Sequence, residues 1–219
     1  MTKPIATSAS RFIVLEGIDG AGKSSQVEPL VTWLRGCGRA VTTCRDPGAT
    51  AAGDAIRAIL LDRHDLQLAP TSEMLLYMAA RAQLVGEVIR PSLARGEWVM
   101  SDRYLLANIV YQGHAGGLDP DTIRQVGAVA TGGLEPDLVL LFDVDLETAA
   151  RRLARPLDKL ENRGDEYRDR LRAGYLAEAA QRPDRIAVVD ATGDLATVHA
   201  NLRAALEHRF PELRSARPT

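Results

Sequence analysis

The chain has 219 residues, of which 46% are hydrophobic and 5% are aromatic, and its formal net charge at pH 7 is −2. This length fits a single α/β domain, and the composition requires a core made mainly of aliphatic side chains. The small negative charge argues against a nucleic-acid-binding surface, because such surfaces usually carry an excess of lysine and arginine. Any anionic ligand must therefore be bound by a local cluster of cations.

The sequence carries no signal for secretion, membrane insertion or a cysteine-based metal centre. Cys37 and Cys44 have neither the number nor the spacing of a disulfide framework or a zinc site. Residues 1–10 lack the apolar segment of a signal peptide, and no run of about 18 apolar residues occurs. We expect a cytoplasmic protein that does not enter a membrane, with residues 1–10 and 211–219 as loose tails.

Five short apolar segments predict buried β-strands. They are residues 12–16, 40–44, 97–101, 138–143 and 186–190. They lack the strict alternation of half-exposed strands, and helical patterns separate them, which favours a parallel sheet. The predicted fold class is α/β: a five-stranded parallel sheet with helices on both faces, in one domain over residues 11–210.

Apolar residues at helical spacing follow the first predicted strand: Val27, Leu30, Val31 and Leu34. Pro29 lies among them and is expected to kink or shorten that helix, because proline removes a backbone donor. A longer helix from about residue 72 is expected to end before Pro91. Its apolar stripe would consist of Leu75, Met78, Ala82, Val85 and Ile89.

A phosphate-binding motif lies between the first strand and the first helix. Residues 17–24 (GIDGAGKS) fit the P-loop pattern G-x-x-x-x-G-K-[ST]. The glycines let backbone N–H groups point at phosphate oxygens, and the helix N-terminus adds partial positive charge. The motif predicts that Lys23 reaches the β- and γ-phosphates of ATP and that Ser24 holds Mg²⁺. The predicted ATP-binding residues are Gly17, Ile18, Asp19, Gly20, Ala21, Gly22, Lys23, Ser24 and Ser25.

Three further segments follow in a fixed order. RDPGAT at 45–50 follows the second strand, YMAAR at 77–81 lies on the long helix, and DRY at 102–104 follows the third strand. With the P-loop, this set resembles the thymidylate kinase family from about residue 12 to about residue 190. The resemblance implies a P-loop kinase fold and a homodimer. It also implies transfer of the γ-phosphoryl group of MgATP to the 5′-phosphate of dTMP.

The resemblance and the residue chemistry together predict an acceptor site. Tyr77 and Arg81 share a helix face, so the ring would stack on thymine while the guanidinium donates to the base edge. The family commonly has Phe at position 77. By resemblance, Asp19 faces the sugar 3′-hydroxyl and Tyr111 crowds the 2′-carbon. The predicted dTMP-binding residues are Asp19, Arg57, Tyr77, Arg81, Arg103, Asn108, Tyr111 and Gln112.

Arg103 follows a strand at the carboxyl edge, where open α/β sheets bind ligands. Its planar fork suits a phosphate, and the resemblance assigns to it the 5′-phosphate of dTMP, with Arg57 as a further phosphate contact. Asp102 is predicted to hold Mg²⁺ together with Ser24. The predicted catalytic residues are Lys23, Asp102, Arg103 and Arg155.

The segment RDPGAT departs twice from the family's common form R-E-P-G-G-T, with Asp46 for Glu and Ala49 for Gly. The shorter carboxylate leaves any direct contact made by Asp46 open. The Asp46–Pro47 bond is a candidate cis peptide, although trans is the default for such bonds.

A basic segment at about 151–165 corresponds to the lid of the family: Arg151, Arg152, Arg155, Lys159 and Arg163. Arg151 and Arg155 are like charges four apart, which is unfavourable on a helix without an anion nearby. Pro156 then interrupts the helix. Because the interior of the P-loop lacks arginine, we expect the lid to supply the catalytic cation, with Arg155 first and Lys159 second.

Structural interpretations compete with these roles. Tyr77 would pack in the core, Asp102 would pair with Arg103, and Arg57 would lie on a solvated helix face, as would the basic lid. Asn108, Tyr111 and Gln112 would belong to a polar loop.

Two other functions compete with phosphorylation of dTMP. A deoxynucleoside kinase is the nearest rival function, and a P-loop ATPase or switch protein is the rival from another class.

Overall fold

The computed structural model describes residues 9–153 and 165–214, and its strands form one sheet. The strands are β1 (Phe12–Glu16), β2 (Val41–Arg45), β3 (Trp98–Asp102), β4 (Leu138–Asp143) and β5 (Ile186–Asp190). Their order is β2-β3-β1-β4-β5, and every neighbouring pair is parallel. The predicted five-stranded parallel sheet is confirmed, with β2 and β3 one residue later than expected.

Burial differs between the centre and the edges of the sheet. All residues of β1 are buried, and only the last residue of β3 and of β4 is half-buried. At the two edges, β2 and β5 keep exposed and half-exposed positions. The expectation of full burial is therefore wrong for these two strands, because each has a neighbouring strand on one side only.

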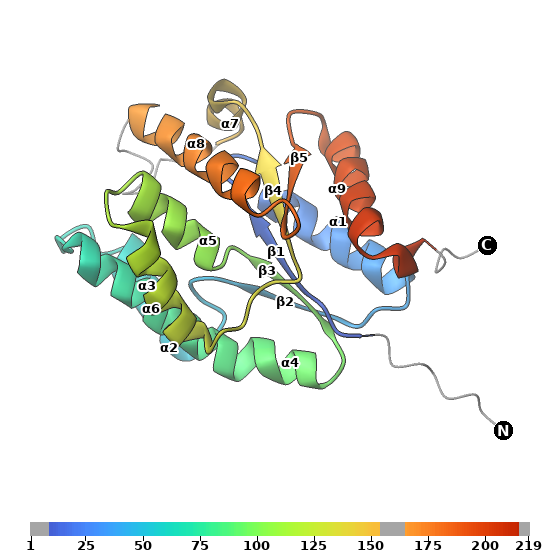
Figure 1. The fold of residues 1–219 in the computed structure, drawn as a ribbon, viewed down its shortest axis with the longest axis horizontal. Helices are drawn as coiled ribbons and strands as arrows, with labels where there is room; N and C mark the ends of the chain where they lie inside the picture. The colour runs from blue at the N-terminus through green and yellow to red at the C-terminus, as the bar shows by residue number, and fades with distance from the viewer. Residues whose placement is uncertain (1–8, 154–164, 215–219) are drawn as a thin grey trace.

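Helices cover both faces of the sheet, as predicted (Figure 1). One face carries α1 (Lys23–Gly36) and α9 (Leu195–Arg209). The opposite face carries α3 (Pro70–Leu84), α5 (Leu105–Asn108), α6 (Pro120–Thr131) and α8 (Asp165–Gln181). The remaining helices are α2 (Ala51–Leu61), which packs against α3, α4 (Arg90–Ala94) before β3, and α7 (Leu146–Arg152) after β4.

The parallel strands bring the predicted motifs to one edge of the sheet. The P-loop follows β1, while RDPGAT and DRY begin at the carboxyl ends of β2 and β3. Because β3 pairs with both β1 and β2, the three motifs emerge side by side. This edge is where open α/β sheets bind their ligands.

Pro29 does not shorten α1, which continues to Gly36. Proline removes one helical hydrogen bond, but Val27 packs against the core before Pro29, and Leu30, Val31 and Leu34 are buried in the core after it. The predicted shortening is therefore wrong, because tertiary packing stabilises the helix.

The long helix passes the proline at which the sequence predicts its end. It begins at Pro70, widens into the π-helical turn η1 (Val85–Ile89) and continues as α4, which contains Pro91. In the wider turn the N–H of Arg90 donates to the carbonyl of Val85, five residues earlier. This change of hydrogen-bond spacing lets the helix continue although Pro91 has no N–H.

The buried face of α3 also differs from the predicted stripe. Leu75 is 49% exposed and Ala82 is exposed, whereas Tyr77 and Arg81 are buried beside Met78. The apolar periodicity misplaces this face because a buried arginine with charged and polar partners occupies part of it.

The segment after α9 is not a loose tail as far as residue 214. Pro211–Leu213 form a 3₁₀ turn, and Phe210 and Leu213 are buried in the core. The predicted tail at 211–219 is therefore wrong for its first residues, while residues 1–8 and 215–219 lie outside the described part of the chain. Within that part, no helix is both long and apolar enough to cross a membrane.

Candidate active site

A cleft of about 750 Å³ opens over the P-loop at the carboxyl edge of the sheet. A second pocket of about 120 Å³ adjoins it, with α3, α5 and the π-helical segment η2 (Ile109–His114) contributing to its wall. Four residues line both cavities: Asp19, Asp46, Arg57 and Arg103. Two ligands could therefore lie end to end, with charged side chains at their junction.

The P-loop requires glycine where neighbouring backbone approaches it. Gly17 has a φ of 139°, and a side chain there would meet the Phe142 carbonyl oxygen at 2.6 Å. Gly20 has a φ of 83°, and a side chain there would overlap the carbonyl of Ala149 in α7. Backbone conformation and close packing both exclude other residues at these positions. The loop is thus held between the end of β4 and the helix α7.

Lys23 lies under the P-loop with its ammonium group buried. Its Nζ donates to the carbonyl oxygens of Gly17 and Ile18 at 2.9 and 3.0 Å. Burial and the charge of Arg103 lower the pKa of Lys23 to about 8, although Asp19 partly opposes this. Of the predicted ATP-binding residues, Gly17 and Ile18 do not line the cleft, whereas Asp19 to Ser25 do.

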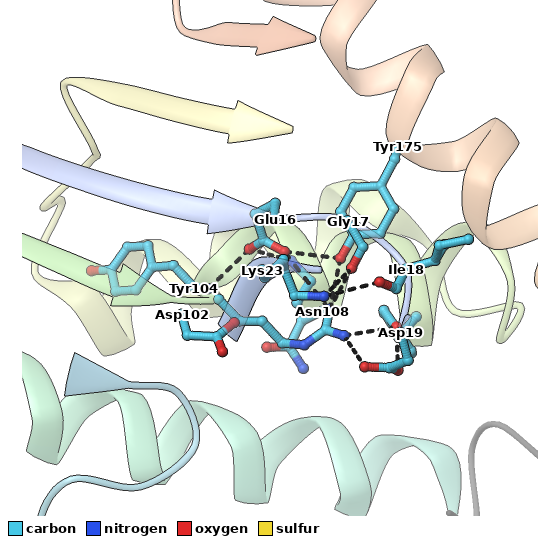
Figure 2. A network of polar contacts seen from close by, with 12 residues as sticks. Glu16, Gly17, Ile18, Asp19, Lys23, Asp102, Tyr104, Asn108 and Tyr175 are labelled. Carbon is cyan, nitrogen blue, oxygen red and sulfur yellow. Dashed lines mark hydrogen bonds and ion pairs between the residues drawn. The ribbon is translucent and has the colours of Figure 1, made fainter. Parts of the chain in front are cut away.

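Glu16 ends the central strand with a completely buried carboxylate (Figure 2). Oε1 accepts from the backbone N–H groups of Tyr104 and Ala107, and Oε2 accepts from the hydroxyl of Tyr175 in α8 at 2.9 Å. Burial raises the pKa of Glu16, while the charge of Arg103 at 3.9 Å opposes the rise. Sequence reasoning missed Glu16 and Tyr175. A charged residue that closes an otherwise apolar central strand is the signal that could have found Glu16.

Arg103 has a φ of 71°, a conformation that costs energy for a residue with a side chain. Its guanidinium donates to Asp19 Oδ1 at 2.6 Å and to the hydroxyls of Tyr111 and Tyr175, both at 3.1 Å. The guanidinium also lies 4.9 Å from the centroid of the Tyr111 ring. The strained backbone is thus compensated by contacts that fix the side chain at the junction of the two cavities.

Asp19 completes this cluster. Burial alone would raise its pKa, but the charges of Arg103 and Lys23 and a hydrogen bond from Tyr111 hold it below its usual range. Asp19 therefore remains an acceptor throughout the physiological pH range. The Tyr111 hydroxyl donates to Asp19 and accepts from Arg103, which fixes the ring in the pocket wall.

Ser24 and Asp102 lie together, as expected for a shared cation. The Ser24 hydroxyl donates to Asp102 Oδ2 at 3.2 Å, while Oδ1 is buried without a hydrogen-bond partner in the described part of the chain. Asp102 forms no ion pair with Arg103 among the described residues, so that alternative is wrong. One hydroxyl and one carboxylate suit Mg²⁺, which binds few protein ligands and the phosphates of its substrate.

Arg81 forms a buried ion pair in the second pocket. Its Nε donates to Asp46 Oδ2 at 2.5 Å, and Nη2 donates to Asn108 Oδ1 at 2.5 Å and to the Tyr104 carbonyl at 3.2 Å. Burial raises the pKa of Asp46, and the Arg81 charge opposes this. The contact of Asp46, which the sequence left open, is therefore the ion pair with Arg81.

The loop that carries Asp46 has two unusual backbone features. The Asp46–Pro47 peptide, which the sequence marks as a candidate cis bond, is cis. Ala49, which stands where the family commonly has Gly, has a φ of 62°, in the region that favours glycine.

All predicted acceptor-site residues line the second pocket: Asp19, Arg57, Tyr77, Arg81, Arg103, Asn108, Tyr111 and Gln112. Arg57 is half-buried and donates to the Pro47 carbonyl at 3.0 Å, so it does not lie on a solvated face. Asn108, Tyr111 and Gln112 lie buried on helical segments and not in a loop. Tyr77 is only 9% exposed, so it both packs in the core and lines the pocket.

The lid prediction falls mostly outside the described residues, including Arg155, Lys159 and Arg163. The helix α7 ends at Arg152, and Leu153 leaves it with a ψ of 90°. Within this helix Arg151 pairs with Glu147 at 3.7 Å. Arg152 lines the P-loop cleft and donates to the carbonyls of Ala191, Thr192 and Gly193 after β5.

Comparison with known proteins decides the family. The family model described as thymidylate kinase matches residues 15–202, which is most of the chain. This chain belongs to the thymidylate kinase family.

Individual relatives agree with this membership. The thymidylate kinase of Leifsonia xyli is 46% identical over 90% of this chain and 95% of its own length. That of Rhodopirellula baltica is 43% identical over 90% of this chain and 80% of its own length. The crystal structure of thymidylate kinase from Ehrlichia chaffeensis, 28% identical, has a TM-score of 0.73 and covers 91% of this chain and 99% of that one. The predicted P-loop kinase fold is confirmed.

The lowered pKa of Lys23 predicts pH-dependent nucleotide binding. If the charged form binds phosphate, the dissociation constant of MgADP should rise roughly tenfold between about pH 7.5 and about pH 9, as the fraction of charged Lys23 falls. Isothermal titration calorimetry in buffers of matched ionic strength measures this. Lys23→Met is the control and should bind more weakly with no such slope. A flat profile for the unmodified protein would contradict the role of Lys23.

Proposed function

We propose that this thymidylate kinase binds MgATP in the P-loop cleft and dTMP in the second pocket. It is an ATP:dTMP phosphotransferase, which forms ADP and dTDP. The observation that supports the proposal is the shared wall of the two cavities, where Arg57 and Arg103 lie. A γ-phosphoryl group above Lys23 and a 5′-phosphate beside Arg103 would meet at this junction.

Cations at the junction suit a monophosphate acceptor. Phosphoryl transfer between two anionic groups needs positive charge around the transferring phosphate. Lys23 from below and Arg103 and Arg57 from the acceptor side would supply it. A nucleoside acceptor would instead need a carboxylate base near an uncharged hydroxyl, so the two arginines favour the nucleotide over the nucleoside.

The rest of the second pocket suits a deoxyribonucleotide with a pyrimidine base. The Tyr77 ring would stack on the base, and Arg81, fixed by Asp46, would donate to its edge. Asp19 would accept from the sugar 3′-hydroxyl. Tyr111, fixed by Asp19 and Arg103, would leave no room for a 2′-hydroxyl.

Ser24 and Asp102 would hold Mg²⁺, since Asp102 Oδ1 has no hydrogen-bond partner among the residues that the structure describes. Bound there with the phosphates of ATP, the ion would offset negative charge that develops on the β- and γ-oxygens.

The lid would supply one more cation. The interior of the P-loop, residues 18–21, contains no arginine. We therefore propose that Arg155 contacts the transferring phosphate when the lid closes, with Lys159 as the second candidate. This role rests on the charge requirement of the reaction and on the resemblance to the family.

The subunit arrangement and the location are also proposals. Leu75 on α3 and Val129 on α6 are 49% and 84% exposed, and the two helices pack together through Met74, Met78 and Ile123. Exposed aliphatic residues on adjoining helices favour a contact with a second copy of the chain. The free thiols of Cys37 and Cys44 support a cytoplasmic location.

Activity measurements test the assignment of the acceptor pocket. ADP release from MgATP should be stimulated by dTMP far more than by nucleosides or by other nucleoside monophosphates. Tyr77→Ala should raise the KM for dTMP roughly tenfold through lost stacking and leave the KM for ATP unchanged. Tyr77→Phe keeps the ring and should behave like the unmodified enzyme. ATP hydrolysis without an acceptor would contradict the function, and equal KM changes for both substrates would contradict the role of Tyr77.

The lid proposal is tested by turnover. Arg155→Ala should lower kcat by about 100-fold or more, because an arginine at the transferring phosphate acts mainly in the transition state, and the KM for dTMP should stay within a few-fold. Arg151→Ala is the control, since Arg151 pairs with Glu147 on α7. If Lys159→Ala alone slows turnover, Lys159 has the role. Normal turnover by both variants would remove the lid from the mechanism.

Light scattering during size-exclusion chromatography tests the dimer. We expect a mass about twice the chain mass of 23.7 kDa, and a shift toward the monomer for Val129→Glu. Val188→Glu is the matched control, because Val188 is likewise an exposed valine, at 50%, but lies on the edge strand β5. A monomeric unmodified protein would contradict the proposal.

A further inference from the structure

A chain of hydrogen bonds runs behind the second pocket from Arg81 to Glu73. Arg81 donates to Asn108 Oδ1, and Asn108 Nδ2 donates to Gln112 Oε1 at 2.7 Å. Gln112 Nε2 then donates to Glu73 Oε1 at 2.9 Å. All four side chains are at least nine-tenths buried, and Glu73 is the one that does not line the pocket.

The chemistry at the two ends of this chain determines the orientation of both amides. A carboxylate can only accept, so Gln112 must turn its NH₂ toward Glu73 and its oxygen toward Asn108. A guanidinium can only donate, so Asn108 must turn its oxygen toward Arg81 and its NH₂ toward Gln112. Both ends therefore require the same arrangement, and neither amide can rotate without breaking two buried hydrogen bonds.

This arrangement decides which polar atoms a base would meet. Gln112 has its nitrogen engaged with Glu73 behind the pocket, so its oxygen, which accepts one hydrogen bond from Asn108, has a lone pair left. Asn108 has a second N–H. Of the five N–H groups of Arg81, one on Nη1 is left, because the others donate to Asp46, Met78, Tyr104 and Asn108. The pocket therefore offers hydrogen-bond donors, from Asn108 and Arg81, to one polar position of a bound base. It offers an acceptor, the Gln112 oxygen, to the neighbouring position.

Thymine is complementary to that pattern, and cytosine is its inverse. Thymine presents an acceptor at O4 and a donor at N3–H, whereas cytosine presents a donor at its 4-amino group and an acceptor at N3. A site with fixed donors and acceptors rejects the inverse pattern strongly, because buried polar groups would face like groups.

We propose that Glu73, which lies outside the pocket lining, strengthens the selection of thymine over cytosine, because it and Asn108 together hold Gln112 as an acceptor. This inference rests on the proposed binding of dTMP in the second pocket. Glu73 is a positioning residue, and its effect concerns the ratio of two acceptors and not the overall rate. Thymine and uracil share the same polar edge, so Glu73 does not separate them.

Glu73→Gln tests the proposal, because an amide at position 73 can accept or donate and so leaves only the hydrogen bond from Asn108 to hold the orientation of Gln112. We expect the ratio of kcat/KM for dTMP to kcat/KM for dCMP to fall at least tenfold, with the KM for ATP unchanged. Glu87→Gln is the matched control. Glu87 is an exposed glutamate on η1 that accepts from the Gln83 side chain and is remote from the pocket lining. Its loss should leave the ratio unchanged.

A structural role for Glu73 gives a different result. If Glu73 only stabilises the fold, Glu73→Gln should lower the melting temperature and reduce both kcat/KM values by the same factor, and that outcome would overturn the proposal. Absence of dTMP turnover by the unmodified enzyme would instead refute the proposed function, so the two failures are distinguishable.

A double variant that exchanges the residues at positions 73 and 112 provides a second test if Glu73→Gln does not fold. In Glu73→Gln combined with Gln112→Glu, the carboxylate at position 112 accepts from residue 73 and still offers an acceptor to the base. The proposal expects this double variant to prefer dTMP over dCMP at least tenfold more strongly than Gln112→Leu, which has no acceptor there. Equal ratios for the two variants would overturn it.

Discussion

Glu16 places a carboxylate at the end of the central strand with none of its surface exposed. An isolated buried charge is very costly, so its neighbours must supply hydrogen bonds and positive charge. The N–H groups of Tyr104 and Ala107 begin α5 against it, and Tyr175 brings α8 to it. The helices α5 and α8, both distant from β1 in sequence, are thereby anchored to it (Figure 2). The Arg103 guanidinium lies 3.9 Å from the same carboxylate and lines both cavities.

The site also shows how a chain of net charge −2 concentrates positive charge locally. The charge of Arg103 lowers the pKa of Lys23, and the carboxylate of Asp19 opposes this effect. Both cations in turn lower the pKa of Asp19. Bound phosphates would relieve this repulsion, which lowers the pKa of Lys23 in their absence. The second pocket follows the same principle, because the pair formed by Arg81 and Asp46 exposes donors without an uncompensated buried charge.

Sequence reasoning was accurate where the signal is local. A strand followed by eight residues of a P-loop and an amphipathic helix is a continuous segment, so its pattern predicts its structure.

Prediction from the sequence was less accurate where tertiary packing overrides local preference. Pro29 and Pro91 both lie within helices that continue, since buried side chains and a π-helical turn compensate for the missing N–H groups. The face of α3 was misplaced because Arg81 is buried by partners on other elements.

The sequence by itself determined the strand pattern, the P-loop and the residue types gathered at the carboxyl edge of the sheet. It also marked every residue that lines the second pocket by resemblance to the family, apart from Asp46, Pro47, Leu61 and Ala107. Only the tertiary structure decided which charges and amides pair. Asp46 lies 35 positions from Arg81, Glu73 lies 39 from Gln112, and Glu16 lies 88 from Tyr104. Such pairs form because burial removes water as the alternative partner, and no local pattern in the chain records which groups burial brings together.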